Sequence, residues 1–417
     1  MSIGIERLAV YTPQYGLALA DLAAARGVAP AKYTQGLGVQ EMAVAPPWED
    51  VVTMAATAGA RVLRAAGVDP ASIGMLLVAT ETAVDHAKPV SIFVHDLLGV
   101  GPHCRTYELK HACYAGTAAL MTAADWVRAG GARPRRALVI ATDIARYELG
   151  SSGEPTQGAG AVAMLVGREP QALILGDESG TYAGNVHDFW RPLGRREAIV
   201  DGQHSVDCYL IALAGAFQMY RALERPPFEP DEAFQDRVAR MLYHTPFPKM
   251  AMKAHRRFAE LDWRASHARW AQVEPRLEEA AAQSYVELAA PALTAVSRIG
   301  NTYTASLYVC LASLLEAESR MLTGRRVGLF SYGSGSCAEF FSGVVPTSAP
   351  RVSDTGIATQ LRERTLVDVP TYERLARTGD AGGEPAAGFA GEFVFHGVRN
   401  DRREYGRVEP VAARASA

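Results

Sequence analysis

The stretch Glu108-Leu-Lys-His-Ala-Cys113-Tyr-Ala-Gly-Thr-Ala-Ala-Leu120 joins a strand-like segment to a run of small residues that favours a helix. This order predicts that the thiol of Cys113 lies at or near a helix N-terminus. The helix dipole and the unpaired backbone N–H groups at such a position favour the thiolate, which is the reactive form of cysteine. The alternative is a buried thiol that acts as a small hydrophobic side chain. The rest of the sequence decides between these two interpretations.

Short apolar runs alternate with helical patterns on both sides of this stretch. Buried strands are predicted over 8–11, 75–80, 137–142 and 161–166, and helices over 51–66, 91–98 and 115–129. The second half repeats the pattern with predicted helices over 206–223, 250–261 and 303–317, and predicted strands over 326–331 and 392–395. A solvated helical region is predicted over 262–287 and a loop over 375–391. The last dozen residues are predicted to be frayed. The alternation predicts an α/β architecture with parallel or mixed sheets that are covered by helices.

Composition limits the class of protein. The chain has 417 residues, 48% of them hydrophobic, and a formal net charge of −3. This length fits two or three domain-sized units or two fused similar halves. The charge gives no basic field for nucleic acid and no polybasic patch for a membrane surface. The first residues lack a signal-peptide pattern, and no apolar run is long enough to cross a bilayer. We therefore expect a cytoplasmic protein without a nucleic-acid or membrane partner.

The cysteines argue against a disulfide framework and against a structural zinc site. They are odd in number and scattered, without a CxxC pair. We expect no metal site, and we expect four of them to be buried structural thiols: Cys104, Cys208, Cys310 and Cys337.

Two titratable residues stand where a strand or a fixed segment ends. Glu81 directly follows the strand predicted over 75–80, where apolar walls would raise its pKa into the range of acid/base catalysis. A solvated loop glutamate is the alternative. His244 lies in a proline-containing, extended segment, Leu242-Tyr-His-Thr-Pro-Phe-Pro-Lys249. A histidine fixed in this way can orient or protonate a carbonyl oxygen, whereas a satisfied core histidine is the alternative.

Two polar turns are further candidates. Asn301 follows a glycine at the start of a predicted helix, so its side chain serves either as a cap or as an amide donor to a carbonyl. The turn Gly333-Ser-Gly-Ser336 follows the strand predicted over 326–331 and can direct backbone N–H groups at an oxyanion, or it is a plain turn. No GK[ST] or GxGxxG pattern follows, so a nucleotide loop is not indicated.

A series of stretches, in this order, resembles the 3-hydroxy-3-methylglutaryl-CoA (HMG-CoA) synthase family, a branch of the thiolase superfamily. They are Thr80-Glu-Thr82, Lys110-His-Ala-Cys-Tyr114, Asp143-Ile-Ala-Arg-Tyr147, Gly153-Glu-Pro-Thr-Gln-Gly158, Asp188-Phe-Trp-Arg-Pro192, Val200-Asp-Gly-Gln203, Tyr243-His-Thr-Pro-Phe247, Gly300-Asn-Thr-Tyr-Thr-Ala-Ser306 and Ser331-Tyr-Gly-Ser-Gly-Ser336. The resemblance covers nearly the whole chain. It implies a five-layer αβαβα thiolase fold, a homodimer, and two similar halves. The half over 1–170 would carry Glu81 and Cys113, and the half over 171–417 would carry His244, Asn301 and the Gly-Ser turn.

The resemblance also implies roles. Cys113 would accept an acetyl group from acetyl-CoA as a thioester. Glu81 would remove a methyl proton from that acetyl group and later act as an acid toward the forming alkoxide. His244, helped by Asn301, would hold and polarise the ketone of acetoacetyl-CoA. The backbone N–H groups of Cys113 and Ser334 would form an oxyanion hole, and water would release the product. Coenzyme A thioesters are the implied substrates, and no metal or redox cofactor is expected.

Further residues are candidates for substrate binding. Lys249 and Lys253 follow His244 at helical spacing and would meet the phosphates of coenzyme A, unless they are a solvated helix face. Lys32 is a candidate of the same kind. Three more residues match pocket positions of the family without an assigned chemistry: Asp143, Tyr147 and Asp188.

Two branches of the family carry their acyl groups differently. The Gly-Leu-Gly form within Ala31–Val44 resembles the mevalonate branch, and Val51–Met54 lacks the proline usual in the polyketide β-branching branch. The stretch Leu193-Gly-Arg-Arg-Glu-Ala198 departs from the mevalonate pattern, in which many enzymes have a less basic run at this place. Its two adjacent arginines would suit an acidic acyl carrier protein as well as CoA phosphates. We expect the CoA enzyme of isoprenoid synthesis, with the carrier-protein enzyme as the alternative. The intact set of Cys113, Glu81 and His244 disfavours a silent scaffold, and Glu81 disfavours a ketoacyl synthase.

Overall fold

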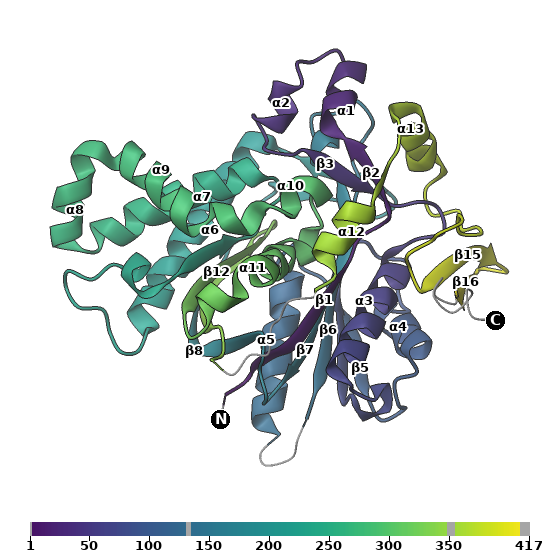
Figure 1. Ribbon diagram of the computed structural model, residues 1–417, viewed down its shortest axis with the longest axis horizontal. Coiled ribbons are helices and arrows are strands. Elements are labelled where there is room, and N and C mark those ends of the chain that lie inside the picture. Colours follow the sequence, from purple (N-terminus) through teal and green to yellow (C-terminus); the bar gives the residue numbers. More distant parts are fainter. Residues whose placement is uncertain (1, 131–134, 348–354, 409–417) are drawn as a thin grey trace.

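The computed structural model describes residues 2–130, 135–347 and 355–408. Its main feature is a nine-stranded sheet with the order β11-β12-β13-β8-β1-β7-β6-β4-β5 (Figure 1). The strands are β1 (Gly4–Tyr11), β4 (Met75–Ala79), β5 (Arg105–Leu109), β6 (Ala137–Ala145), β7 (Gly158–Gly167), β8 (Leu173–Ala183), β11 (Arg240–Tyr243), β12 (Arg326–Gly333) and β13 (Cys337–Val344).

One topology occurs twice in this sheet. In the first half β1 pairs antiparallel with β7, β7 antiparallel with β6, and β6 parallel with β4. In the second half β8, β13, β12 and β11 repeat these three pairings in the same order. The opening strands of the two halves, β1 and β8, meet through a short antiparallel pairing. The two halves are therefore pseudo-equivalent, and β5 is an additional edge strand of the first.

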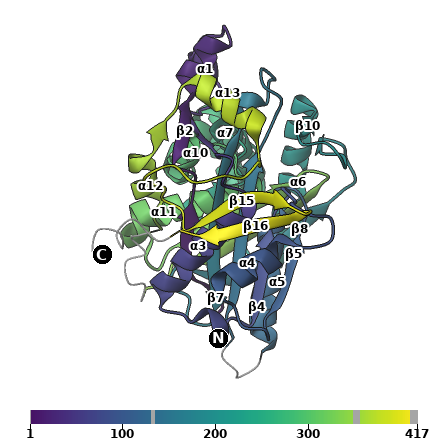
Figure 2. The ribbon, with the colours of Figure 1, turned by 90° about the vertical axis from the view of Figure 1, so that its right-hand side faces the viewer.

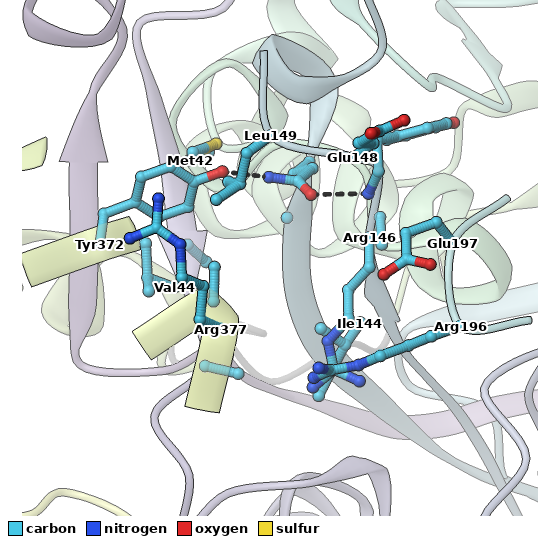
Figure 3. A pocket seen from close by; sticks show the side chains of 17 residues that line it. Met42, Val44, Ile144, Arg146, Glu148, Leu149, Arg196, Glu197, Tyr372 and Arg377 are labelled. Atoms are coloured by element: carbon cyan, nitrogen blue, oxygen red, sulfur yellow. Dashed lines mark hydrogen bonds between the residues drawn. The ribbon is translucent and has the colours of Figure 1, made fainter. Parts of the chain in front are cut away.

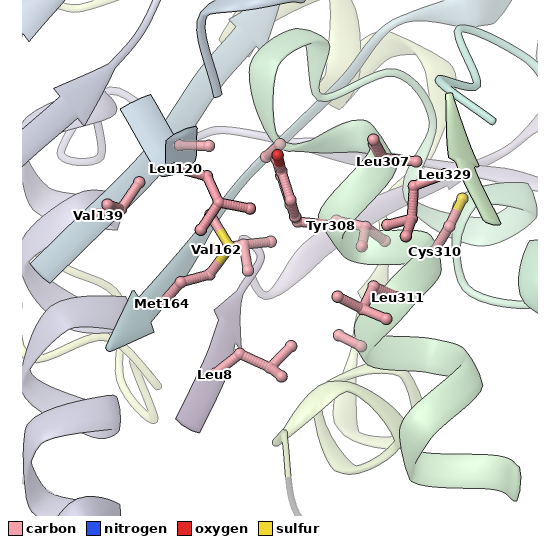
Figure 4. Close-up of a cluster of buried hydrophobic side chains, with 14 of the residues drawn as sticks. Leu8, Leu120, Val139, Val162, Met164, Leu307, Tyr308, Cys310, Leu311 and Leu329 are labelled. Carbon is pink, nitrogen blue, oxygen red and sulfur yellow. The ribbon is translucent and has the colours of Figure 1, made fainter. Parts of the chain in front are cut away.

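Helices occupy three layers around the two halves of the sheet. The outer layers are α3 (Val51–Ala66) with α4 (Val90–Leu98), and α6 (Gly202–Leu223) with α7 (Pro248–Arg264), which lie on opposite sides in Figure 1. The middle layer holds α5 (Ala115–Ala129) and α11 (Ser306–Leu322). Every residue of α11 from Ser306 to Leu315 is buried, which is typical of a helix enclosed on all sides. Figure 4 shows the core between the middle helices and the strands. The expected five layers are confirmed.

Smaller elements cover the ends of the sheet. A three-stranded sheet is formed by β2 (Tyr15–Ala18), β3 (Glu41–Val44) and β14 (Thr365–Leu366). The hairpin of β15 and β16 lies over α3 and α4, the outer helices of the first half (Figure 2). A late segment of the sequence therefore packs against the first half. The other α-helices and strands are α1 (Leu19–Ala25), α2 (Ala31–Thr34), β9 (Phe189–Trp190), β10 (Ile199–Val200), α8 (His267–Val273), α9 (Leu277–Leu288), α10 (Val296–Ile299), α12 (Ile357–Glu363), α13 (Val369–Thr378), β15 (Phe393–Arg399) and β16 (Arg402–Arg407). Short 3-10 helices occur at Pro70–Ser72, Glu154–Thr156, Phe234–Arg237, Glu274–Arg276, Ala290–Leu293 and Tyr303–Ala305.

Most predicted helices and strands are confirmed, with two differences of note. The helix predicted from residue 303 begins as a 3-10 turn over Tyr303–Ala305, where Tyr303 has a φ of 44°, and the α-helix itself begins at Ser306. The loop predicted over 375–391 is wrong at its start, because α13 continues to Thr378. The side chain of Asp368 caps this helix by accepting from the Thr371 amide at 2.9 Å. The predicted frayed end lies mostly outside the described residues, although β16 reaches Arg407. No helix in the described ranges is long and apolar enough to span a bilayer.

Candidate active site

The loop before α5 holds Cys113 in a fixed conformation. Ala112 has a φ of 39°, a left-handed conformation that is strained for a residue other than glycine. The end of β12 lies against the same loop, because a Cβ on Gly333 would be 2.5 Å from the His111 oxygen and 2.6 Å from the Tyr114 nitrogen. Only glycine permits this close approach, which brings the adjacent Ser334 into the site.

A cavity of about 360 Å³ gathers residues from both halves of the chain. Its walls include aromatic and apolar side chains, such as Phe189, Tyr209, Phe247 and Tyr303. Six of the predicted site residues line it: Cys113, Tyr147, His244, Lys253, Asn301 and Ser334. Five do not line it: Glu81, Asp143, Asp188, Lys249 and Lys32.

The surroundings of Cys113 oppose the thiolate that its position before a helix predicts. Burial raises the pKa of the Cys113 thiol well above its usual range, and the charge of Glu81 raises this pKa further, followed by Asp143 and Asp188. These effects favour the neutral thiol, whereas the helix dipole favours the thiolate. The prediction of four buried structural thiols is wrong in part, because Cys104 and Cys337 are half-buried.

Glu81 is a buried carboxyl group close enough to influence Cys113. Its side chain is 7% exposed, and its Oε1 has no hydrogen-bond partner among the described residues. Burial raises the pKa of Glu81 well above its usual range, the charge of Asp143 adds to this, and Arg191 opposes it. A buried carboxyl group with a raised pKa takes up a proton more readily than a solvated one does, which suits a general base.

Asp143 joins the segment that carries Glu81 to the start of α11. Its Oδ1 accepts from the Glu81 amide at 2.9 Å, the Thr82 amide at 3.0 Å and two threonine hydroxyls. Its Oδ2 accepts from the amide and hydroxyl of Thr304, at 3.1 and 2.5 Å. All these donors bind the carboxylate, so Asp143 positions Glu81 and does not itself face the cavity.

Asp188 fixes the Gly-Ser turn from outside the cavity. Its carboxylate accepts from the Tyr332 hydroxyl at 2.7 Å and from the Gly335 amide at 2.9 Å. The turn is therefore tied on one side to Asp188 and on the other to the loop of Cys113. Both ties hold the Ser334 backbone beside the thiol.

His244 and Asn301 present polar groups to the cavity. His244 is 3% exposed, and burial lowers the pKa of its imidazole to about 3, so the ring is neutral. Its backbone is held by the Phe330 oxygen at 2.7 Å and the Tyr209 hydroxyl at 2.8 Å. The Oδ1 of Asn301 accepts from the Tyr303 amide at 2.9 Å, while its Nδ2 donates to no described residue. The Oδ1 of Asn301 thus supports the turn before α11, although Asn301 is not the N-cap residue, and its role as an amide donor to a carbonyl stays a prediction.

The three lysines lie on neighbouring elements. Lys253 is exposed and lines the cavity, and Lys249 lies one turn earlier on α7. Lys32 is exposed on α2, whose following residues dock on α7 through the Lys249 amide and the Leu37 oxygen at 3.0 Å. Arg196 lines a different cavity of about 500 Å³, shown in Figure 3, which shares Tyr147 with the first.

Two sequence profiles of one enzyme family match this chain, one in each half. The N-terminal sequence profile of the hydroxymethylglutaryl-coenzyme A synthases matches residues 1–172, and the C-terminal profile matches residues 174–374. This chain belongs to the HMG-CoA synthase family. The HMG-CoA synthase of Enterococcus faecalis is 35% identical over 409 residues, covering 97% of this chain and 100% of the relative.

Solved structures of HMG-CoA synthases share the fold. MvaS in complex with 3-hydroxy-3-methylglutaryl coenzyme A superposes with a TM-score of 0.91 at 45% identity, over 97% of this chain and 99% of the other. The HMG synthase of the curacin pathway, in complex with a holo donor acyl carrier protein (ACP), gives 0.86 at 30% identity, over 98% and 100%. The expected thiolase-type fold and HMG-CoA synthase family are confirmed, and residue roles remain predictions.

Sequence reasoning did not single out several residues that shape the HMG-CoA synthase site. Ala112 acts through backbone geometry, and Tyr209 and Tyr303 through their rings. Gly333 belongs to the turn that the sequence did indicate, and the structure adds its close approach to the loop of Cys113.

Proposed function

We propose that this chain is an HMG-CoA synthase of the mevalonate pathway, which condenses acetyl-CoA with acetoacetyl-CoA and water to give HMG-CoA and coenzyme A. The observation that carries the proposal is the single cavity lined by Cys113, His244 and Asn301, with the unpaired carboxyl of Glu81 buried close to the thiol. This set provides a nucleophile, a base and carbonyl donors in one water-poor site.

The first step is acetyl transfer to Cys113. Sulfur attacks the carbonyl carbon of acetyl-CoA, the bond from that carbon to the CoA sulfur breaks, and the thiol proton leaves with the CoA thiolate. Because Cys113 is neutral at rest, its proton must move during this step. The backbone N–H groups of Cys113 and Ser334 would stabilise the oxyanion, and the close approach of Gly333 to the loop of Cys113 supports this assignment.

The second step forms the carbon–carbon bond. Glu81 removes a proton from the acetyl methyl group, and the resulting carbanion attacks the ketone of acetoacetyl-CoA. His244 and the Nδ2 of Asn301 donate to that ketone oxygen, and the alkoxide receives a proton from Glu81. A neutral His244 polarises the ketone by hydrogen bonding without delivering a full positive charge.

The third step is hydrolysis. Water adds its oxygen to the acyl carbon on Cys113, the carbon–sulfur bond breaks, and the thiol regains a proton. The product leaves as HMG-CoA with a new carboxylate. No other reactant is needed for the atoms to balance.

The choice of coenzyme A over a carrier protein rests on similarity and on the cavity mouth. The MvaS structure bound to HMG-CoA is 45% identical, against 30% for the curacin enzyme bound to its donor ACP. Lys253 at the cavity suits the phosphates of coenzyme A, as do Lys249 and Lys32 nearby. The alternative is a polyketide β-branching synthase, which the basic pair Arg195–Arg196 would suit.

The test measures the intact mass of the protein after incubation with acetyl-CoA or with an acetylated carrier protein. We expect an acetyl-sized gain from acetyl-CoA, lost in Cys113→Ser and retained in the control Cys104→Ser. Adding acetoacetyl-CoA should release HMG-CoA. A gain only from the carrier protein would favour the alternative, and no gain from either would contradict the covalent mechanism.

We further propose a homodimer that forms across β5. This strand is an edge of the large sheet and is partly exposed, whereas β11 at the other edge is mostly buried. A free strand edge is a natural site of pairing with a second copy. A monomeric mass at micromolar concentration in analytical ultracentrifugation would contradict this.

The division into halves at 1–170 and 171–417 also stays a proposal. The repeated strand order supports it, while the packing of β15 and β14 against the first half shows that the second half is not self-contained. Cleavage at an engineered protease site at position 170 should leave the two pieces associated. Separation of the pieces would contradict this arrangement.

A further inference from the structure

A buried hydrogen-bond chain links the C-terminal helix α13 to the wall of the catalytic cavity. Tyr372 on α13 is 3% exposed, and its hydroxyl accepts from the Gln157 Nε2 at 2.6 Å. The Oε1 of Gln157 accepts from the Tyr147 backbone N–H at 2.7 Å. Figure 3 shows both bonds beside the 500 Å³ cavity. The catalytic reaction proposed above assigns no role to Tyr372 or Gln157.

The outer end of the chain determines its direction. The Tyr372 hydroxyl donates to the Glu154 Oε1 at 3.1 Å, and a carboxylate can only accept. Arg26 binds both oxygens of Glu154, at 2.7 and 2.8 Å, which holds this carboxylate in place. With its proton committed to Glu154, the hydroxyl offers only a lone pair to Gln157. The Gln157 amide therefore has one satisfactory orientation, with its oxygen toward Tyr147.

The inner end of the chain reaches two residues that line the catalytic cavity. The Tyr147 backbone depends on Gln157, and the Tyr147 ring lines the cavity close to Cys113 and Glu81. The neighbouring Thr156 oxygen accepts from the Asn301 amide at 3.1 Å. A Cβ on Gly300 would be 1.9 Å from the Gln157 oxygen, so the two segments are in close contact.

Tyr147 is a wall shared by two cavities, with the catalytic cavity on one side and the 500 Å³ cavity on the other. Its ring packs directly on Gly153, where a Cβ would be 2.6 Å from the Tyr147 Cδ1. The bond from its backbone N–H to Gln157 is a second support, which sets the ring relative to the two cavities.

We propose that Tyr372 and Gln157 are positioning residues, which set the Tyr147 ring against Cys113 and so couple the docking of α13 to catalysis. This inference rests on the proposed function for its activity readout. It assigns to the C-terminal helix a part in the reaction, although no atom of that helix faces the thiol.

The test uses Tyr372→Phe, with Arg374→Ala as a control on the exposed side of the same helix. We expect Tyr372→Phe to lower kcat about 5- to 20-fold, to change the KM of both thioesters less than about twofold, and to lower the Tm by about 1–3 °C. Arg374→Ala should leave kcat and KM unchanged. A kcat within about twofold of the wild type for Tyr372→Phe would overturn the proposal.

A double-variant comparison separates positioning from a general structural effect. In a Tyr147→Ala background, Tyr372→Phe should change kcat less than about twofold, because the ring through which it acts is gone. If the effects of the two substitutions on kcat multiply instead, the proposal is overturned. The alkylation rate of Cys113 by iodoacetamide provides a readout that does not need the reaction. It should rise about fivefold in Tyr372→Phe and not rise further in the Tyr147→Ala background.

The alkylation rate of Cys113 decides the positioning role even if the wild-type protein forms no HMG-CoA. Absence of HMG-CoA formation would refute the proposed function alone. Unchanged alkylation in Tyr372→Phe would refute the positioning role alone.

Discussion

Replacing Glu81 by glutamine should separate acetylation from condensation. The side chain keeps its shape, and the Oε1 of Glu81 has no hydrogen bond to lose among the described residues. Folding should therefore change little, with a Tm within about 3 °C of the wild type. Loss of a positioned general base lowers a rate by about 10²–10⁴, which corresponds to about 3–5 kcal/mol of activation free energy. We expect this loss in HMG-CoA formation.

The acetylation step should respond differently. Glu81 is not required to accept the thiol proton, so acetyl-cysteine should form within about threefold of the wild-type rate and then accumulate. Because the charge of Glu81 raises the pKa of the Cys113 thiol, Glu81→Gln should lower that pKa. Alkylation by iodoacetamide should then begin at lower pH. The assay pairs intact-mass time courses with product formation by chromatography and mass spectrometry.

A parallel loss of acetylation and condensation would refute this reasoning, since it would make Glu81 part of both steps. Full activity would refute the assignment of Glu81 as the base. Glu339→Gln is a suitable control, because Glu339 is also buried and its pKa is also raised, but it is bound to the Tyr114 hydroxyl at 2.8 Å.

Three further variants test the supporting structure. Gly333→Ala places a Cβ within 2.6 Å of two backbone atoms of the Cys113 loop. It should lower the unfolding free energy, measured by chemical denaturation, by about 1–3 kcal/mol and slow the acetylation of Cys113 at least about tenfold. Acetylation at the wild-type rate would contradict the oxyanion-hole assignment. Asp143→Asn must turn its NH₂ group toward either the Glu81 and Thr82 amides or the Thr304 amide, so it should cost about 3 kcal/mol of unfolding free energy. It also removes a charge that raises the pKa of Glu81, so the acidic limb of the kcat profile, which falls as Glu81 becomes protonated, should move to lower pH; an upward shift would contradict this sign. Lys253→Ala should raise the KM for coenzyme A thioesters about 5- to 10-fold with kcat unchanged and weaken the salt dependence of KM, while Lys88→Ala should do neither.

The sequence predicts the local elements well where each is decided within its own length. The helices over 51–66 and 115–129 are found with the predicted bounds, because each is rich in small and apolar residues and contains no proline. β8 was missed because Asp177-Glu-Ser179 interrupts its apolar pattern, and the strand depends on pairing with β13. Pairings of this kind between distant segments leave no local signal.

The candidate site shows the same contrast between features that a local motif decides and features that depend on contacts between distant segments. The identity of Cys113 and His244 follows from short motifs, but their protonation does not. The carboxylates that raise the pKa of the Cys113 thiol come from residues 81, 143 and 188, which only the fold brings together. A dipole argument made from the helix alone leaves out the burial of the thiol and these three charges, which all raise its pKa. The neutral state of His244 likewise follows from its burial among segments of both halves.

The repeated topology explains why Cys113 and Asn301 line one cavity. Cys113 lies two residues before α5 and Asn301 lies five residues before α11, and these are the two helices of the middle layer. Each loop carries one left-handed residue that is not glycine, Ala112 in one and Tyr303 in the other. The helix starts also touch, since a Cβ on Gly116 would be 2.4 Å from the Thr304 oxygen. The loops that carry the proposed nucleophile and the proposed amide donor therefore lie side by side, which lets one cavity receive residues from both halves of the chain.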